Sequence, residues 1–457
     1  MAKIIDYTIV ISGTAGATEK RAAAFLQEKI KVISGKKIPV VTDDTAAVPL
    51  EIVLGKTNRE DLDGMDFQRA ENKRWEYVLT MKNQRFYITG LGVAPVPIQQ
   101  KTAYVVYDDG HIGTAHGAYV FVEEILGYPM MFAAYCEFQE KPELEMPEQF
   151  HLERTSKFLL GQLPEKTDGP AMYVVPCAVK LEWQMTCIIF KTAAGKLIVI
   201  DGGREEDTEH VLQILETLSG GKKPVVSAWL FSHMHDDHYG VYAKLCREPA
   251  LGSRVQVEHF YCHLLSDAFY GETCQECDQT FIDDKKILLD SEKTLGTTVH
   301  TVQKGDVIRV DEFAFEVIHI PCEERAADMN INDSSVVYKL NYNDQQSILL
   351  LGDAEWVCSE DMVENSREKL KSDVVQVGHH GCGNVSEACY RLIGAEYYIW
   401  QISPRFWYSD GGSGLNTRNT GVNNTVMYIG EAGGKPENQF RDTHGILSFP
   451  LPITTKK

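Results

Sequence analysis

Four apolar runs between residues 197 and 380 lead into aspartate or histidine, and this pattern constrains the fold more than any other feature. The runs are LIVID (197–201), VVSAWLF (225–231) followed by SHMHDDH, SILLLGD (347–353) and VVQVGHH (374–380). Runs of this length and composition are typical of buried β-strands. Four strand-terminal loops that carry such residues are what a β-sandwich needs to gather ligands at one edge.

The loop after the second run has the residues of a metal site. We expect His233 and His235 to converge on one ion, while Asp237 and His238 turn toward a second. Neutral imidazole and carboxylate are ligands that zinc prefers, and that manganese or iron also accept. Taken alone, this loop could be rich in histidine for structural reasons. The three further strand ends favour a metal site.

The combination of motifs resembles the metallo-β-lactamase superfamily over residues 166–457. HMHDDH matches the HxHxDH motif of the family, IDGG matches its first aspartate, GD its bridging aspartate and VGHHG its last histidine. The segments NDSSVVYKL, LLLGD, VGHHG and DTHGI are most similar to the branch that includes the β-lactamase-like domain of competence DNA-uptake proteins and the phosphorylcholine esterases. The resemblance implies an αββα sandwich with two metals at one edge.

The resemblance also implies a role for each matched residue. Asp353 would bridge the two ions, and a hydroxide shared by both ions would be the nucleophile. His379 is the predicted last ligand, which leaves His380 to contact substrate or protonate the leaving group, although this pair can be reversed. Asp201 is predicted to orient a ligand histidine rather than bind metal. The predicted catalytic residues are therefore Asp237, His380 and Asp201.

One departure from the family pattern concerns the first metal. Many members have a further histidine between HxHxDH and the bridging aspartate. Here His319 lies in a strand-like segment, and the expected position near Ser334 holds Asn332-Asp333-Ser334. The first site is therefore predicted to have only His233, His235 and Asp353 as protein ligands. Such a site would be more open and weaker, which argues against a lactamase.

The first half of the chain alternates strand and helix patterns. The succession of SGKKIPVV, EIVLGK, RFYITG and GTAHGAYVFVEEILGYP resembles the accessory α/β domain that precedes the catalytic barrels of α-glucuronidases and β-hexosaminidases. In that resemblance the domain carries no chemistry of its own. We therefore predict an α/β accessory domain over residues 1–150, a linker rich in proline and charge over 151–165, and the catalytic domain over 166–457.

Charge and hydropathy restrict the partners. The formal charge of −20, from 45 basic and 65 acidic residues, should repel duplex nucleic acid and anionic membranes. No apolar run approaches the ~20 residues of a membrane span, and the N-terminus is unlike a secretory signal. The eleven cysteines are scattered in the way that reduced thiols are. We therefore expect a cytoplasmic protein.

The sequence thus predicts a cytoplasmic two-domain hydrolase with two divalent metal ions, zinc being the first choice. A phosphodiester or phosphate ester is the leading substrate class, because an open binuclear site suits phosphoryl oxygens. One alternative is a hydrolase of a carbohydrate-linked ester, amide or lactone, which the accessory domain suggests. Another is a non-catalytic protein that binds metal and carbohydrate. Under both hydrolase hypotheses the partner is a small-molecule or carbohydrate-linked substrate.

Overall fold

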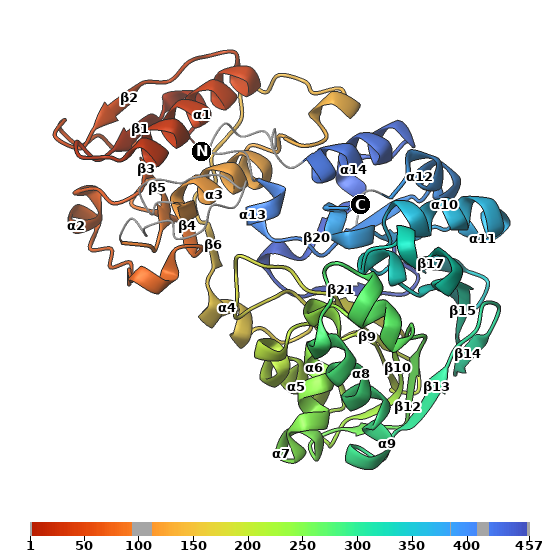
Figure 1. Ribbon diagram of the computed structural model, residues 1–457. Helices are drawn as coiled ribbons and strands as arrows, with labels where there is room; N and C mark the ends of the chain where they lie inside the picture. The colour runs from red at the N-terminus through yellow and green to blue at the C-terminus, as the bar shows by residue number, and fades with distance from the viewer. Residues whose placement is uncertain (1, 94–111, 384, 409–419, 455–457) are drawn as a thin grey trace. The chain divides into compact units, whose positions relative to one another are not determined.

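The computed structural model describes residues 2–93, 112–383, 385–408 and 420–454 (Figure 1). The chain packs into two compact units. Unit 1 contains residues 1–158 together with 404–423, and unit 2 contains residues 159–403 and 424–457. The described residues 404–408 and 420–423, which the sequence analysis assigned to the catalytic domain, thus belong to unit 1.

Unit 1 is built on a mixed sheet with the strand order β2-β1-β3-β5-β4-β6. The first four strands in this order are mutually parallel, and the last two pair antiparallel. The strands are β1 (Thr8–Ile11), β2 (Val40–Thr42), β3 (Glu51–Leu54), β4 (Tyr77–Lys82), β5 (Arg85–Gly90) and β6 (His151–Arg154). The helices are α1 (Ala17–Ser34), α2 (Arg59–Asp63), α3 (Ile112–Val120) and α13 (Pro404–Trp407).

Helix α1 shows how local sequence sets the elements of unit 1. Its apolar positions at three-to-four spacing, among them Phe25, Leu26 and Ile30, are buried. The helix ends at Gly35, which adopts a left-handed conformation with φ 73° and donates its N–H to the carbonyl of Lys31. This 18-residue helix is amphipathic. No helix in the described part of the chain has the length and hydrophobicity that a membrane-spanning segment needs.

Residues 151–165, which we predicted to be a linker, contain regular structure. Strand β6 occupies residues 151–154 and pairs antiparallel with β4. It is followed by the short helix α4 (Ser156–Gly161). The proline and charge content of this region gave no sign of a strand. Pairing with β4, rather than the strand propensity of its own residues, stabilises β6.

Residues 404–408, which belong to unit 1, are held in place by aromatic contacts of Tyr408. The ring of Tyr408 lies 5.1 Å from that of Tyr119 and 6.1 Å from that of His116, both on helix α3. The Tyr408 hydroxyl donates a hydrogen bond to Glu123. Sequence alone could not show this docking, because the partners are at least 285 positions apart.

Unit 2 contains two large sheets. The first has the order β13-β12-β10-β9-β8-β7-β21, with β11 beside β10, and the second has the order β14-β15-β16-β17-β18-β19-β20. The strands of the first sheet are β7 (Ala171–Val174), β8 (Cys187–Lys191), β9 (Leu197–Asp201), β10 (Val225–Leu230), β11 (Gln256–Val257), β12 (His259–Cys262), β13 (Thr298–Thr301) and β21 (Leu447–Pro450). Those of the second are β14 (Val307–Val310), β15 (Phe313–His319), β16 (Val337–Tyr342), β17 (Gln346–Leu350), β18 (Val374–Gln376), β19 (Tyr397–Trp400) and β20 (Gln439–Arg441).

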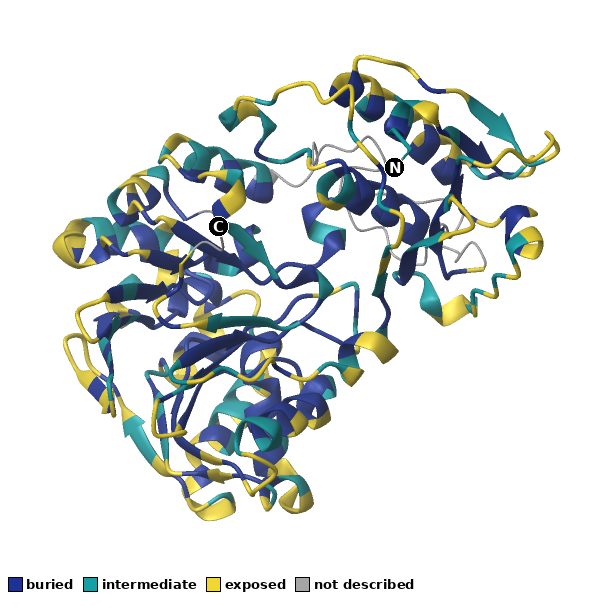
Figure 2. Ribbon diagram, turned by 180° about the vertical axis from the view of Figure 1, so that it is seen from behind, coloured by how far each residue is buried: buried dark blue, intermediate teal, exposed yellow. Residues whose placement is uncertain are grey.

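The two sheets of unit 2 face each other and are covered by helices on their outer sides. Side chains of both sheets, such as Phe190 and Phe315, form one buried core between them. A second core lies between the first sheet and its helices. Figure 1 shows one helix group beside the first sheet and another beside the second, and Figure 2 shows the inner strands as buried. The helices are α5 (Thr208–Leu218), α6 (Asp236–Arg247), α7 (Pro249–Gly252), α8 (Gln279–Leu289), α9 (Ser291–Thr294), α10 (Trp356–Asn365), α11 (Arg367–Leu370), α12 (Glu387–Ile393) and α14 (Thr420–Glu431).

This helix–sheet–sheet–helix order confirms the predicted fold class, an αββα sandwich preceded in the chain by a smaller α/β unit. The physical reason is that each sheet is apolar on both faces, so that each face must be covered by a sheet or by helices.

Candidate metal centre

The four loops identified in the sequence follow strands that lie side by side in pairs. Strands β9 and β10 are parallel neighbours in the first sheet, and β17 and β18 are parallel neighbours in the second. Parallel neighbours have their carboxyl ends at the same edge of a sheet. The loop that carries Asp201 therefore lies beside the HMHDDH loop, and the loop that carries Asp353 lies beside the GHHG turn.

The HMHDDH motif straddles the start of a helix. His235 is the N-cap residue of α6, and Asp237 and His238 lie in its first turn. His233 precedes the helix in the loop after β10. His233 and His238 are buried, as is Asp237, so the helix start directs these side chains into the unit rather than into solvent. Negative side chains in the first turn also favour the helix.

Asp353 is the point at which the loops converge. Its Oδ1 lies 3.1 Å from Nε2 of His238, and its Oδ2 lies 3.5 Å from Nε2 of His380. The Nε2 atoms of His379 and His233 lie 3.9 and 4.0 Å from the same Oδ2. The Asp353 side chain is 1% exposed. One buried carboxylate thus faces imidazole nitrogens from two loops, the HMHDDH loop and the GHHG turn.

Two groups of side chains could each hold a metal ion among the described residues. One group is His233, His238 and Asp353, and the other is Asp237, His238 and His380. Nε2 of His238, Nε2 of His380 and Oδ1 of Asp353 are buried and have no hydrogen-bond partner in the described part of the chain. Leaving such groups unsatisfied costs about 1–3 kcal/mol each. Bound cations would satisfy all three, so the residues fit a metal centre.

Asp201 orients the ligands from the end of β9. Its Oδ2 lies 2.9 Å from Nδ1 of His238 and accepts from the Ser232 hydroxyl at 2.9 Å, while its Oδ1 accepts from the Ser232 N–H at 2.7 Å. Nδ1 of His238 must carry the proton to donate to a carboxylate, which leaves the lone pair on Nε2. This is the arrangement that prepares a histidine to bind metal. Asp201 is fully buried and has φ 61°.

The GHHG turn points its two histidines in different directions. His379 and His380 both have left-handed backbone conformations, with φ 45° and 52°. Nδ1 of His380 donates to the carbonyl oxygen of Gln401 at 2.8 Å, and its Nε2 lies 3.3 Å from Asp237 Oδ2. Nδ1 of His379 lies 2.7 Å from Glu355 Oε1. The His380 side chain is 1% exposed, whereas that of His379 is 24% exposed.

This geometry favours the reversed assignment, which the sequence analysis left open for the pair. The predicted ligand was His379, with His380 free for the substrate. In the structure His380 belongs to a cluster that could hold an ion and His379 does not. The sequence could not show which of the two histidines is the ligand. Both have a left-handed backbone conformation, and the side-chain directions of such residues follow neither the strand period nor the helix period.

Burial and charge set the protonation of the centre. Burial lowers the pKa of His233 well below its usual value, which keeps the ring neutral and able to bind a cation. Burial opposes ionisation of Asp353, but His238 and His380 hold the pKa of this carboxyl well below its usual range. For His379, burial opposes protonation, but the contact with Glu355 raises its pKa.

The remaining predicted residues are placed less closely. Nδ1 of His235 lies 3.2 Å from Nε2 of His233, but His235 is in neither metal-holding group. His319 ends strand β15 and contacts Asp361 at 3.0 Å. Asn332, the first residue of the Asn332-Asp333-Ser334 run, donates to Glu355 at 3.0 Å. Asn332 thus supports the carboxylate that contacts His379.

Sequence reasoning missed two residues. Glu355 accepts hydrogen bonds from Asn330 and Asn332 and contacts His379. Arg204 lies with its Nη2 3.4 Å from Asp237 Oδ2 and its Nη1 2.6 Å from Asp236. Glu355 follows the GD motif by two residues, which is the only sequence signal for it. Arg204 directly follows IDGG and carried no signal of its own.

Comparisons with known proteins are confined to weak structural similarity. No family model matches the sequence, and no curated protein matches it. A metallo-β-lactamase fold protein YhfI from Bacillus subtilis is 13% identical, with a TM-score of 0.37, over 61% of this chain and 99% of its own. An isothiocyanate hydrolase from Delia radicum gut bacteria is 13% identical, with a TM-score of 0.36, over 62% and 100% of the two chains. Unliganded yeast PDE1 is 12% identical, with a TM-score of 0.37, over 62% and 99%. The fold assignment therefore rests on the strand order and the layers, and the site rests on its own geometry.

Proposed function

We propose that the protein is a hydrolase that uses two divalent metal ions. The observation that carries this proposal is Asp353, a buried carboxylate whose two oxygens face imidazole nitrogens on different sides. A carboxylate in this position suits a bridge between two ions. In this proposal His233 and Asp353, which share a metal-holding group, would hold the first ion together with the sequence-predicted His235. Asp237, His238 and His380 would hold the second ion, with Asp353 between the two. Zinc is the proposed metal because imidazole and carboxylate are its usual ligands.

The residues around the ligands have separate tasks. When bound, two such cations would lower the pKa of a water molecule that they share and would polarise the substrate oxygens. Asp201 keeps His238 in the tautomer that offers Nε2. Arg204 holds the carboxylate of Asp237 in place. Each of these two contacts orients a proposed ligand side chain.

His379 is the proposed proton donor for the leaving group. Glu355 stabilises its protonated form, and of the two histidines in the turn it is the more exposed. When water adds to the phosphorus atom and the P–O bond breaks, the departing oxygen would take the proton from Nε2 of His379. General acid catalysis of this kind contributes roughly 10²–10⁴-fold when the leaving group is poor.

A phosphodiester or phosphate ester is the proposed substrate class. Two adjacent cations can stabilise both the attacking and the leaving oxygen of an in-line displacement at phosphorus. A site with few protein ligands on the first ion leaves room for substrate oxygens. Carbohydrate-linked esters, amides or lactones are the second candidate substrate class. A protein that binds metal and carbohydrate without catalysis is the remaining alternative. Small-molecule or carbohydrate-linked compounds are therefore the proposed partners.

Hydrolysis of bis(p-nitrophenyl) phosphate tests the proposal. The protein is reconstituted with zinc or manganese and compared with Asp353→Ala and with Asp311→Ala, a control at a turn outside the centre. We expect turnover that depends on metal, is lost in Asp353→Ala and is kept in Asp311→Ala. Fully metallated protein without turnover would reject phosphate chemistry, and a screen of sugar esters and amides would then decide between the remaining candidates.

A second experiment separates the two adjacent histidines. His380→Ala should lose metal, whereas His379→Gln should keep it. His379→Gln should hydrolyse p-nitrophenyl diesters at a nearly normal rate, because that leaving group needs no proton, and should be slow on diesters with an alkyl leaving group. Loss of metal in His379→Gln with full occupancy in His380→Ala would restore the opposite assignment.

A further inference from the structure

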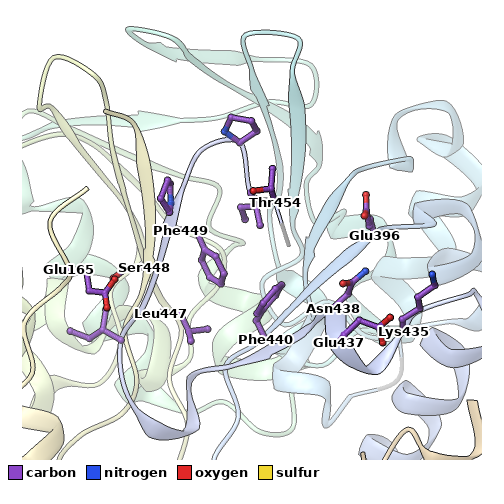
Figure 3. Close-up of a pocket in the computed structure, with 14 residues that line it drawn as sticks. Glu165, Glu396, Lys435, Glu437, Asn438, Phe440, Leu447, Ser448, Phe449 and Thr454 are labelled. Atoms are coloured by element: carbon purple, nitrogen blue, oxygen red, sulfur yellow. The ribbon is translucent and has the colours of Figure 1, made fainter. Parts of the chain in front are cut away.

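A cavity of about 710 Å³ lies in unit 2 away from the metal centre residues. It is lined by parts of strands β20 and β21 and by the chain that follows β21 (Figure 3). None of the proposed metal ligands lines it. Its size is in the range of pockets that hold small organic molecules.

The cavity exists because two sheet edges meet there. Strand β20 is the last strand of the second sheet, and β21 is the last strand of the first. After β21 the chain is fixed to the second sheet by Gln346, whose side chain makes two hydrogen bonds to the backbone of Ile453, at 3.0 and 2.7 Å. This clamp spans the two sheets beside the cavity and gives it a defined wall.

The centre of the cavity is apolar. The rings of Phe440 and Phe449 stand edge to face, with their centroids 5.1 Å apart. Figure 3 shows them between the polar residues at the two sides, with Leu447 beside them. These side chains are only partly buried, because they pack against the core between the sheets on one side and face the cavity on the other. An apolar ligand group would cover them.

One side of the cavity has unsatisfied acceptors. Asn438 is 7% exposed and lines the cavity, and its Oδ1 has no hydrogen-bond partner among the described residues. Glu396 and Glu437 lie on the same side in Figure 3 and form no ion pair in the described part of the chain. The ammonium of Lys435 is also there and offsets one of the two charges. This side keeps one negative charge in excess, so a ligand that donates hydrogen bonds and carries one positive charge would satisfy Asn438 and balance that charge.

The opposite side differs in charge. Glu165 lines the main cavity and also an adjoining hollow of about 340 Å³, which Arg441 and His444 line as well. Arg441 brings one positive charge to the adjoining hollow that Glu165 also lines, so the carboxylate and the guanidinium give this side no excess negative charge for a second cation. The cavity therefore combines one cation-binding end with an apolar middle.

We propose that this cavity binds a primary organic amine, with its ammonium group at Asn438, Glu396 and Glu437 and its apolar body against Phe440 and Phe449. The ammonium N–H groups supply the donors that Asn438 lacks. The aromatic rings contact the body of the ligand and add a cation–π attraction when the charge lies near a ring face. This site is independent of the proposed hydrolase reaction.

Binding of 2-phenylethylammonium chloride to the full chain, measured by calorimetry and by ligand-observed NMR, tests the proposal. Three comparison ligands isolate its parts: 2-phenylethanol lacks the charge, trimethyl(2-phenylethyl)ammonium lacks the N–H groups, and 3-phenylpropanoate reverses the charge. We expect the primary amine to bind at about millimolar concentration or tighter. The alcohol and the trimethyl compound should bind several-fold more weakly, and the anion should not bind.

Variants place the site. Glu396→Gln combined with Glu437→Gln should weaken binding by roughly three- to tenfold, since each exposed carboxylate contributes modestly. Glu364→Gln, at an exposed position of α10, is the matched control and should leave binding unchanged. Both exchanged carboxylates are exposed, so these variants should fold. Equal binding of amine and alcohol, no effect of the double variant, or no binding of the amine at about 10 mM, roughly ten times the weakest expected dissociation constant, would each overturn the proposal.

Discussion

Replacing Asp201 by asparagine tests whether this residue prepares His238 to bind metal. Asparagine is nearly isosteric with aspartate and tolerates the left-handed backbone found here, so the fold should survive. Oδ1 of Asp201 accepts from the backbone N–H of Ser232, and the amide oxygen of asparagine must take that place. The amide NH₂ then faces Nδ1 of His238, where the carboxylate oxygen was.

The consequence is a change of tautomer. Two donors cannot face each other, so Nδ1 of His238 would become an acceptor and the proton would move to Nε2. A proton on Nε2 of His238 uses the lone pair that a metal ion would need. Nε2 lies 3.1 Å from Oδ1 of Asp353. Loss of an orienting partner of this kind typically lowers metal affinity by about 10–100-fold. This corresponds to about 1.4–2.7 kcal/mol of binding free energy.

The assay is competition for zinc against a chromophoric chelator, together with thermal unfolding with and without metal. Asp311→Asn is the matched control, because Asp311 also has a left-handed backbone, with φ 51°, and accepts hydrogen bonds at a turn outside the centre. The control should keep the wild-type affinity. A folded Asp201→Asn variant that binds zinc as tightly as the wild type would refute the reasoning about the tautomer.

Three further outcomes follow from the structure of unit 2. Gly381→Ala should destabilise unit 2 by about 1–3 kcal/mol, measured by denaturant unfolding, because an added Cβ would lie 2.3 Å from the indole of Trp400 at φ 81°; an unchanged midpoint would contradict this. His319 lowers the pKa of Asp361 to about 2, so the wild type should be more stable than Asp361→Asn above about pH 4 by about 1–2 kcal/mol, and this advantage should vanish as the pH falls through about 2; a difference that does not depend on pH would reject the pair. Phe315→Ala should cost about 3–5 kcal/mol, because the ring is fully buried between the sheets; a loss under 1 kcal/mol in the same unfolding assay would show that the core there is loose.

The fold class could be read from the sequence because it depends on local patterns. Apolar runs such as 197–201 and 225–231 have no polar face, and only a strand covered on both sides buries them. The end of α1 at Gly35 could be read for the same reason, since left-handed backbone favours glycine. The strand β6 could not be read, because its pairing with β4 stabilises it more than its own composition does.

For the candidate site, the sequence by itself determined the residue types and their delivery at strand ends: Asp201, the HMHDDH loop, Asp353 and the GHHG turn. Only the tertiary structure decided which of His379 and His380 faces Asp353 and Asp237 in a metal-holding group, and only it brought in Glu355. The physical reason is that ligand chemistry is a property of a side chain, and strand propensity is a property of a short segment. Partner choice depends on distances between loops that are far apart in the chain, and two sheets must pack before those distances exist.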